Sequence, residues 1–125
     1  MIDIFSLKVE EIASKIKDAQ LTSVEVCENY IKKINKFEKD LKAWVHFDKK
    51  ILLEKAAEAD EYRRSGKPTG PLHGIPVAVK DIVGTADMPT ECGTVIKKEK
   101  SFSQNAEIID SVSYTHLTLP TKRIV

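Results

Sequence analysis

Apolar residues recur at helical spacing through the first half of the chain. A stripe after Ser6 predicts a helix that this serine caps and that ends at about Ala19; its apolar members are Val9, Ile12, Ala13 and Ile16. A longer stripe predicts a second helix to about residue 37, made of Val26, Cys27, Tyr30, Ile31, Ile34 and Phe37. Thr22 and Glu25 stand at its start with the spacing of a capping box, in which both side chains accept hydrogen bonds from backbone N–H groups.

A third helix is predicted from Asp48, which can cap it, to Gly66, which would end it. Its inward positions are Ile51, Leu52, Ala56, Ala59 and Tyr62. Residues 41–47 alternate well enough for a short strand or an extended link. Packing at the core boundary is favoured over a binding pocket for three aromatic residues of this region, Trp44, His46 and Tyr62.

The second half of the chain has a different pattern. Ile75–Val79 is an apolar run of strand length and predicts a strand covered on both faces, with Pro76 near its beginning. Alone, such a strand would present unpaired edges. Residues 84–104 read as a loop, after which Asn105 is expected to cap a helical start over 106–110.

The tail, residues 112–125, does not fit this pattern and contains no acidic residue. We expect its β-branched residues and Pro120 to break the preceding helix after about one turn. A back-translation of Val112–Thr121 resembles a transposon-end adapter used in sequencing libraries. We therefore divide the chain into a domain fragment, 1–111, and a non-native tail, and we expect the natural sequence to continue past Ser111. The alternative is a genuine strand ending in a proline turn.

Composition narrows the class of protein. The 125 residues carry 20 basic and 19 acidic side chains, so the net charge of +1 gives no electrostatic case for nucleic acid or a polybasic membrane anchor. Cys27 and Cys92 are too few for a disulfide framework and lack metal-ligand spacing. Neither a membrane span nor a signal peptide is visible, which makes a cytoplasmic location the expectation.

Lys80 is the one candidate for chemistry that the residues themselves offer. No phosphate loop or dinucleotide-binding glycine pattern is present, and the histidines, His46, His73 and His116, lack zinc-site spacing. Lys80 ends the predicted strand and is followed by Asp81. It can simply reach solvent. If it is instead held in low dielectric, the neutral amine becomes a base able to activate a serine.

The segment around Lys80, Gly70-Pro71-Leu72-His73-Gly74-Ile75-Pro76-Val77-Ala78-Val79-Lys80-Asp81, resembles the N-terminal hallmark of the amidase signature family. The resemblance continues through Thr85 and the cluster Thr90–Thr94. The N-terminal helices are similar as well, in the patterns Ser23-x-Glu25 and Ala56-Ala57-x-Ala59-Asp60. The likeness spans roughly residues 5–110.

This resemblance implies an α/β fold: N-terminal helices followed by a buried strand, as the first part of an α/β/α sandwich around a mixed sheet in a much longer chain. It implies a Ser–cis-Ser–Lys triad that hydrolyses amide bonds, with Lys80 as the catalytic lysine and the oxyanion hole formed by a Gly/Ser-rich loop. No metal or organic cofactor is implied. The expected partner is a small-molecule amide, with no direct contact to nucleic acid or membrane; a homodimer of the full-length form stays open.

The chain departs from the family pattern because both serines and the Gly/Ser-rich loop lie downstream of the Lys-Asp motif. No role falls to the serines near the end of the chain, which are Ser101, Ser103, Ser111 and Ser113. A truncated amidase, itself inactive, is the favoured interpretation. One alternative is a fragment of the A subunit of a tRNA-dependent amidotransferase, although that subunit typically has Asp-Asn after the lysine. Another is a helical interaction module formed by residues 1–65.

Overall fold

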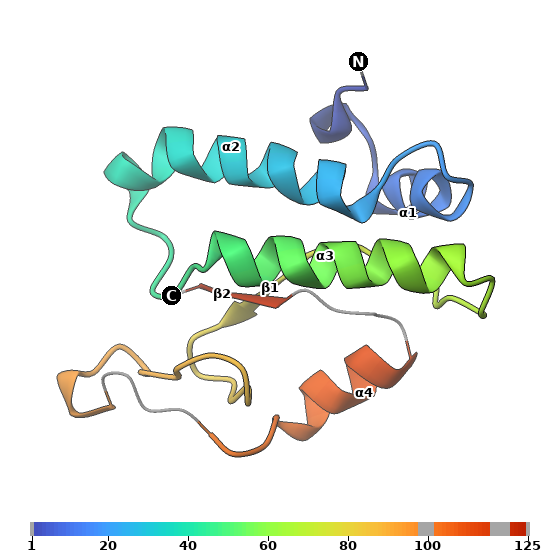
Figure 1. Cartoon of the computed structure of the whole chain (residues 1–125). Helices are drawn as coiled ribbons and strands as arrows, with labels where there is room; N and C mark the ends of the chain where they lie inside the picture. The colour runs from blue at the N-terminus through green and yellow to red at the C-terminus, as the bar shows by residue number, and fades with distance from the viewer. Residues whose placement is uncertain (1, 98–101, 116–120, 125) are drawn as a thin grey trace.

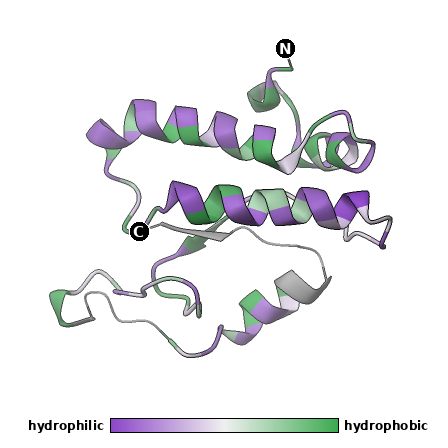
Figure 2. Cartoon of the chain, viewed as in Figure 1, coloured by the Kyte–Doolittle hydropathy of each residue, from purple (hydrophilic) through white to green (hydrophobic). Residues whose placement is uncertain are grey.

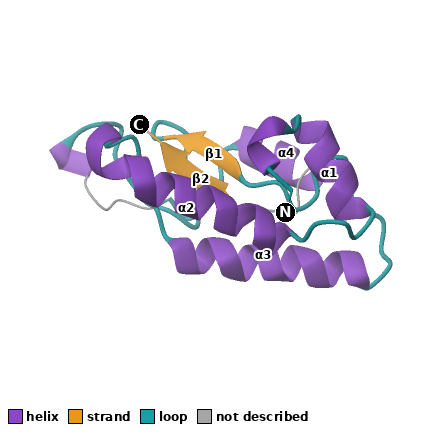
Figure 3. Ribbon diagram, turned by 90° about the horizontal axis from the view of Figure 1, so that it is seen from above, coloured by secondary structure: helices purple, strands orange, loops and turns teal. Residues whose placement is uncertain are grey.

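The computed structural model describes residues 2–97, 102–115 and 121–124 and shows an α/β chain (Figure 1). Its helices and strands follow one another as η1 (Ile4–Ser6), α1 (Val9–Lys17), α2 (Ser23–Leu41), α3 (Lys49–Arg64), β1 (Val77–Lys80), η2 (Val95–Lys97), α4 (Glu107–Thr115) and β2 (Thr121–Ile124). Here η marks a 3-10 turn. Helices α2 and α3 lie side by side, α1 packs near the start of α2, and the two strands lie beside the helices, with α4 beyond them (Figures 1 and 3).

Two apolar clusters hold the helical part together. The first connects α1 and the start of α2 to the residue that precedes the strand segment, and consists of Ile4, Ile12, Ile16, Leu21, Val26 and Ile75. The second lies between α2 and α3 and consists of Cys27, Ile31, Leu52 and Ala56. Both long helices show alternating polar and apolar bands (Figure 2), as expected of helices that bury one face. Ile75 thus ties the approach to β1 to the helical core.

The helix starts were largely predictable from local capping. The Thr22 hydroxyl accepts a hydrogen bond from the Glu25 N–H at 3.0 Å, and the Glu25 carboxylate accepts one from the Thr22 N–H at 2.8 Å, which confirms the capping box. Asp48 caps α3 as predicted. The prediction that Ser6 caps the first helix was wrong: α1 begins after Lys8, and the Ser6 hydroxyl donates to the Asp3 carbonyl within η1.

The strand differs from its prediction in length and in cover. It begins at Val77, directly after Pro76, and its side chains alternate: Val79 is buried, whereas Ala78 and Lys80 are exposed. Cover on both faces was therefore wrong for this chain. One edge of β1 pairs in parallel with β2, in the register Val77↔Thr121, so that edge does not lack a partner. Residues 43–48 form a link with a single bridge residue, His46, rather than a strand of several residues.

The helix after the loop is longer than predicted. Helix α4 continues through Val112 to Thr115, so the β-branched residues do not break it after one turn. Asn105 uses its side chain differently from a helix cap: its oxygen accepts from the Ala86 N–H at 2.8 Å, and its amide donates to the Asp110 carboxylate. Residues 116–120, which include Pro120, lie outside the described residues. The non-native origin of the tail stays a prediction.

A buried carboxylate joins α3 to α2. Asp60 is only 3% exposed, and its two oxygens accept hydrogen bonds from the Ser23 N–H at 2.8 Å and the Val24 N–H at 3.1 Å. These two N–H groups belong to the first turn of α2, which has no partners within the helix for its amides. A negative charge is also favourable at a helix N-terminus. Asp60 therefore caps the start of α2, whose first two residues stand 37 and 36 positions earlier in the chain.

The His73-Gly74 pair docks on the same junction. Nε2 of the buried His73 lies 2.7 Å from the Ala59 carbonyl oxygen, so the ring bonds to the residue next to Asp60. Gly74 has φ +77°, and a Cβ atom there would collide with the Ser23 hydroxyl and crowd the Ile16 side chain. The segment that leads into β1 is thereby held against α1, α2 and α3 at once.

We predict that Gly74→Ala destabilises the chain more than Gly66→Ala. Both glycines have left-handed φ values, +77° and +76°, where an L side chain costs about 1–2 kcal/mol. Gly66 has open space where its Cβ would stand, whereas Gly74 meets Ser23, which adds about 1–3 kcal/mol of overpacking. Urea unfolding followed by helical circular dichroism measures the difference, and Ser23→Ala should recover part of it. Equal losses in the two glycine variants would contradict the packing argument.

Candidate active site

Lys80 stands at the C-terminal end of β1, on its open face. Since side chains alternate along a strand, the burial of Val79 directs Lys80 outward. The Lys80 carbonyl accepts a hydrogen bond from the Val83 N–H at 3.0 Å, which closes a turn directly after the strand. The described residues offer the Lys80 ammonium no ion-pair partner and leave the side chain exposed. The low-dielectric surroundings that a basic lysine needs are thus not provided by this part of the chain.

Asp81 has the opposite environment, although it is the next residue. It is 2% exposed and is surrounded by the loop that follows Met88. Its carboxylate accepts hydrogen bonds from the Glu91 N–H at 2.9 Å and the Gly93 N–H at 3.3 Å, while its carbonyl accepts one from the Cys92 N–H at 3.0 Å. Three consecutive backbone amides of the loop therefore converge on one residue.

Left-handed backbone at two positions lets the loop wrap around Asp81. Cys92 has φ +53° and Gly93 has φ +68°, and turns in the backbone can direct successive N–H groups toward a common centre. The loop is packed as well as hydrogen-bonded, because Thr85 and Thr90 are 0% and 1% exposed. A carboxylate at the centre of such a concavity satisfies the loop amides with charge-assisted bonds.

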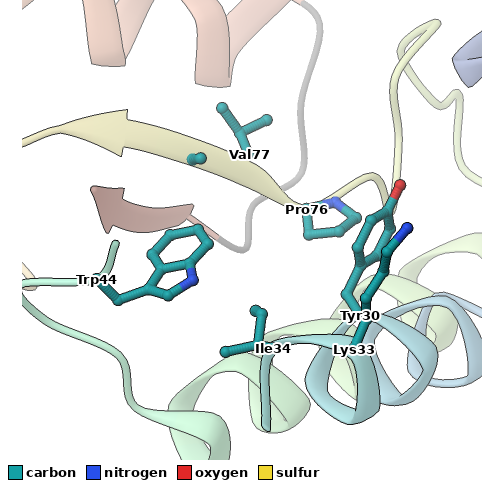
Figure 4. Close-up of a pocket in the computed structure, with 7 residues that line it drawn as sticks. Tyr30, Lys33, Ile34, Trp44, Pro76 and Val77 are labelled. Atoms are coloured by element: carbon teal, nitrogen blue, oxygen red, sulfur yellow. The ribbon is translucent and has the colours of Figure 1, made fainter. Parts of the chain in front are cut away.

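An apolar groove lies beside β1, and Lys80 is not among the residues that line it. It has a volume of about 270 Å³ and is lined by Tyr30, Lys33, Ile34, Trp44, Pro76, Val77 and Ala78 (Figure 4). Trp44 and Tyr62 are half-buried, in agreement with the prediction of boundary packing, and the Tyr62 ring lies 5.6 Å from that of His73. Trp44 additionally forms one wall of the groove, so the alternative of a pocket, which was not favoured from the sequence, also applies to this residue.

Residues 2–97, 102–115 and 121–124 contain no group of three or more histidine, cysteine or acidic side chains arranged to hold a metal ion. His46 and His73 lie apart on different elements, and His116 is outside the described residues. Within the same ranges, none of the helices is long and apolar enough to cross a membrane.

Comparison with known proteins identifies the family. The model of the family described as Amidase matches residues 25–116, which include the strand, Lys80 and the loop around Asp81. The chain belongs to the amidase family. The match also includes the first five residues of the tail, 112–116.

Curated members of the amidase family are similar to this chain in sequence. The A subunit of the glutamyl-tRNA(Gln) amidotransferase from Streptomyces coelicolor is 40% identical over 96 residues, which are 77% of this chain and 19% of that protein. The protein of the same name from Lachnospira eligens is 44% identical over 86 residues, 69% of this chain and 18% of that protein. The chain therefore spans about a fifth of the length of these relatives.

Solved amidase structures share the fold. The peptide amidase from Stenotrophomonas maltophilia superposes with a TM-score of 0.81 at 23% identity, over 98% of this chain and 24% of that one. Fatty acid amide hydrolase superposes with a TM-score of 0.79 at 28% identity, over 95% and 20% of the two chains. The α/β arrangement expected from the resemblance is thereby shown for this segment of the family fold, while the complete mixed sheet and the catalytic role of Lys80 stay predictions.

The anchoring role of Asp81 was missed by the sequence reasoning, which treated this residue as part of the hallmark only. The one signal was an acidic residue, Asp81, directly after an apolar strand, with a glycine, Gly93, 12 positions later. That signal is weak, because an aspartate at a strand end is equally at home in solvent. Only the burial and the three loop amides distinguish the two cases.

We predict that Asp81→Asn loosens the loop locally. The asparagine amide places a donor where the carboxylate accepted one of the two loop N–H groups, and a bond to a charged acceptor contributes about 1.5–3 kcal/mol, or about ten- to hundredfold in an opening equilibrium. Hydrogen exchange followed by NMR should show faster exchange at Glu91 and Gly93 by such a factor. The amides of Ser23 and Val24, bonded to Asp60, are the internal control and should keep their rates. Uniform acceleration of all amides, or none at the loop, would refute the local role.

Proposed function

We propose that this chain is the lysine-bearing N-terminal part of an amidase that hydrolyses a carboxylic amide C–N bond. The observation that carries the proposal is the position of Lys80: it ends the family's hallmark strand, it points to the open face of β1, and the turn to Val83 and the Asp81 loop hold the backbone on its other side. An amine on a flexible side chain, at an otherwise anchored strand end, suits proton exchange with a group approaching from that face.

In the proposed reaction, the neutral Lys80 amine accepts a proton from a cis-peptide serine, which in turn accepts one from the nucleophilic serine. The nucleophile attacks the amide carbonyl, the C–N bond breaks with a proton delivered to the leaving ammonia or amine, and water then hydrolyses the acyl-enzyme to a carboxylate. Backbone N–H groups of a Gly/Ser-rich loop stabilise the oxyanion. Both serines and this loop are proposed to lie in the natural sequence that continues past Ser111.

The exposed state of Lys80 agrees with this division. An amine serves as a base near neutral pH when surrounding protein reduces its contact with water. The chain spans about a fifth of its relatives, so the cover on the open face of β1 is proposed to come from the remaining four-fifths, as the other layers of an α/β/α sandwich. The proposed substrate is a small amide, the reaction needs no metal or organic cofactor, and a cytoplasmic location stays part of the proposal.

A second candidate is the A subunit of a tRNA-dependent amidotransferase. The names of the relatives from Streptomyces coelicolor and Lachnospira eligens favour it. The sequence Asp81-Ile82-Val83 after the lysine favours the general amidases, because that subunit typically has Asp-Asn there. Co-purification of the full-length protein with two partner subunits would decide for the amidotransferase. The helical interaction module accounts for α1 to α3 only and gives no reason for a family match through β1.

We predict that the 125-residue chain does not hydrolyse amides, since Lys80 alone has no serine to activate. Incubation of the purified chain with a panel of aryl and aliphatic amides, with ammonia and amine release as the measurement, should give the rate of buffer. A control preparation carrying Lys80→Ala should be indistinguishable. Hydrolysis that disappears in the Lys80→Ala chain would overturn the division of the triad.

We predict that Lys80→Ala in the complete gene lowers kcat about 10²–10⁴-fold, the range for loss of a general base. The gene is first obtained by long-read sequencing across the codons for Asp110–Thr121, where the proposal requires an uninterrupted frame into a Gly/Ser-rich segment. Lys80→Arg should be equally inactive, because a guanidinium keeps the charge but does not lose its proton. Lys39→Ala, at an exposed position in the last turn of α2, is the control and should keep full activity. Wild-type activity in Lys80→Ala would refute the proposed function.

A further inference from the structure

Asp81 is a buried charged group that the proposed mechanism does not use. We propose that Asp81 is a positioning residue for Lys80: by holding the loop Thr90–Thr94, it fixes the backbone at the end of β1 and with it the direction in which the Lys80 side chain leaves the strand. The inference rests on the proposed function of Lys80 and concerns how that lysine is aimed.

Asp81 accepts hydrogen bonds from the loop through both its side chain and its backbone. Its carboxylate and its carbonyl together accept from the N–H groups of three consecutive residues, Glu91 at 2.9 Å, Cys92 at 3.0 Å and Gly93 at 3.3 Å. The carboxylate alone would tolerate a shift of the Asp81 backbone by rotating its side chain. The additional bond to the carbonyl removes that freedom, because side chain and backbone are held by the same rigid stretch of loop.

The anchored backbone of Asp81 restrains Lys80, the residue next to it. Lys80 and Asp81 are joined by one planar peptide, so fixing one Cα atom and its carbonyl leaves few orientations for the other. On the Lys80 side, the carbonyl is held by the Val83 N–H at 3.0 Å, and Val79 is buried. Both ends of this peptide are therefore anchored, while the Lys80 side chain itself is exposed.

The Lys80 amine must be placed accurately to exchange a proton, although its side chain is flexible. The lysine amine is carried on a flexible stem of four carbons, and proton transfer requires that it lie within about 3 Å of its partner. A displacement of about 1 Å at a catalytic group can cost about a hundredfold in rate. Because the surroundings of Lys80 on the described chain are open, the direction set at its Cα atom is the contribution that this segment makes to placing the amine.

A carboxylate suits this position better than its closest analogues. Asparagine has the same shape, but its single acceptor oxygen leaves either the Glu91 N–H or the Gly93 N–H facing an NH2 group. Glutamate keeps the charge and both acceptors on a stem that is one methylene longer. The order of function expected from the proposal is therefore Asp, then Glu, then Asn.

The test uses the full-length enzyme with Asp81→Asn and Asp81→Glu, and Asp60→Asn as the matched control. Asp60 is buried to the same degree, 3% against 2%, and also accepts from two backbone N–H groups, but it belongs to the junction of α2 and α3. Steady-state kinetics well below the melting temperature should show kcat reduced about ten- to hundredfold in Asp81→Asn, with KM changed less than about threefold. Asp81→Glu should be intermediate. Asp60→Asn should melt earlier yet keep its kcat.

Three outcomes would overturn the inference: kcat of Asp81→Asn within about threefold of wild type, a loss that appears in KM alone, or an equal loss of kcat in Asp60→Asn. The first shows that Lys80 needs no such anchor, the second that the loop binds substrate instead, and the third that any buried aspartate has the same effect. The Lys80→Ala variant distinguishes failure of the positioning role from failure of the proposed function. If that variant is inactive while Asp81→Asn is not, only the positioning role fails; if Lys80→Ala is active, the proposed function fails first.

Discussion

The carboxylate of Asp60 at the start of α2 is the contact on which the arrangement of this chain depends. It satisfies two amides that a helix cannot satisfy itself, and it does so from α3, so the two longest helices are joined by charge-assisted bonds as well as by apolar contacts. The residue before it receives the His73 ring, and the residue it caps packs on Gly74. Three separated sequence patterns, around residues 23, 60 and 74, are thus one structural unit.

This unit holds the approach to β1, while the far end of the strand, at Lys80, has an anchor of its own. The chain leaves Gly74 already fixed against the helices, places Ile75 in the first apolar cluster, and enters β1 after Pro76. The strand then needs only four residues to reach Lys80, and the Asp81 loop secures its far end. The residue that precedes the strand, Ile75, is held in the apolar cluster, and the Asp81 loop holds the far end. Within the strand, the Val79 side chain is buried. The face that carries Lys80 stays open in the described chain.

The features predicted from the sequence were those with local causes. The capping box at Thr22, the Asp48 cap and the stop at Gly66 each act over three residues or fewer, so their signals are complete in a short window. Asp60 and Asp81 act over distances of 36 and 10 residues, and no periodicity marks the partner of a buried carboxylate. The family resemblance includes Asp60 and Asp81 in its sequence patterns, but it does not say which backbone groups these carboxylates bind. The prediction that both faces of β1 are covered was wrong, because an apolar run does not show which of its side chains meet other residues of the described chain.

Trp44 is the one tryptophan of the chain, and it stands in the groove wall opposite Pro76 and Val77. Its indole is half-buried, between the end of α2 and the beginning of the strand that carries Lys80. Indole emission shifts with the polarity of its surroundings. The tryptophan fluorescence of this molecule therefore reports on a single place, the groove between α2 and β1. The chain thereby contains an intrinsic fluorescent reporter beside its hallmark motif. Its emission would change when another molecule binds in the groove that Trp44 lines.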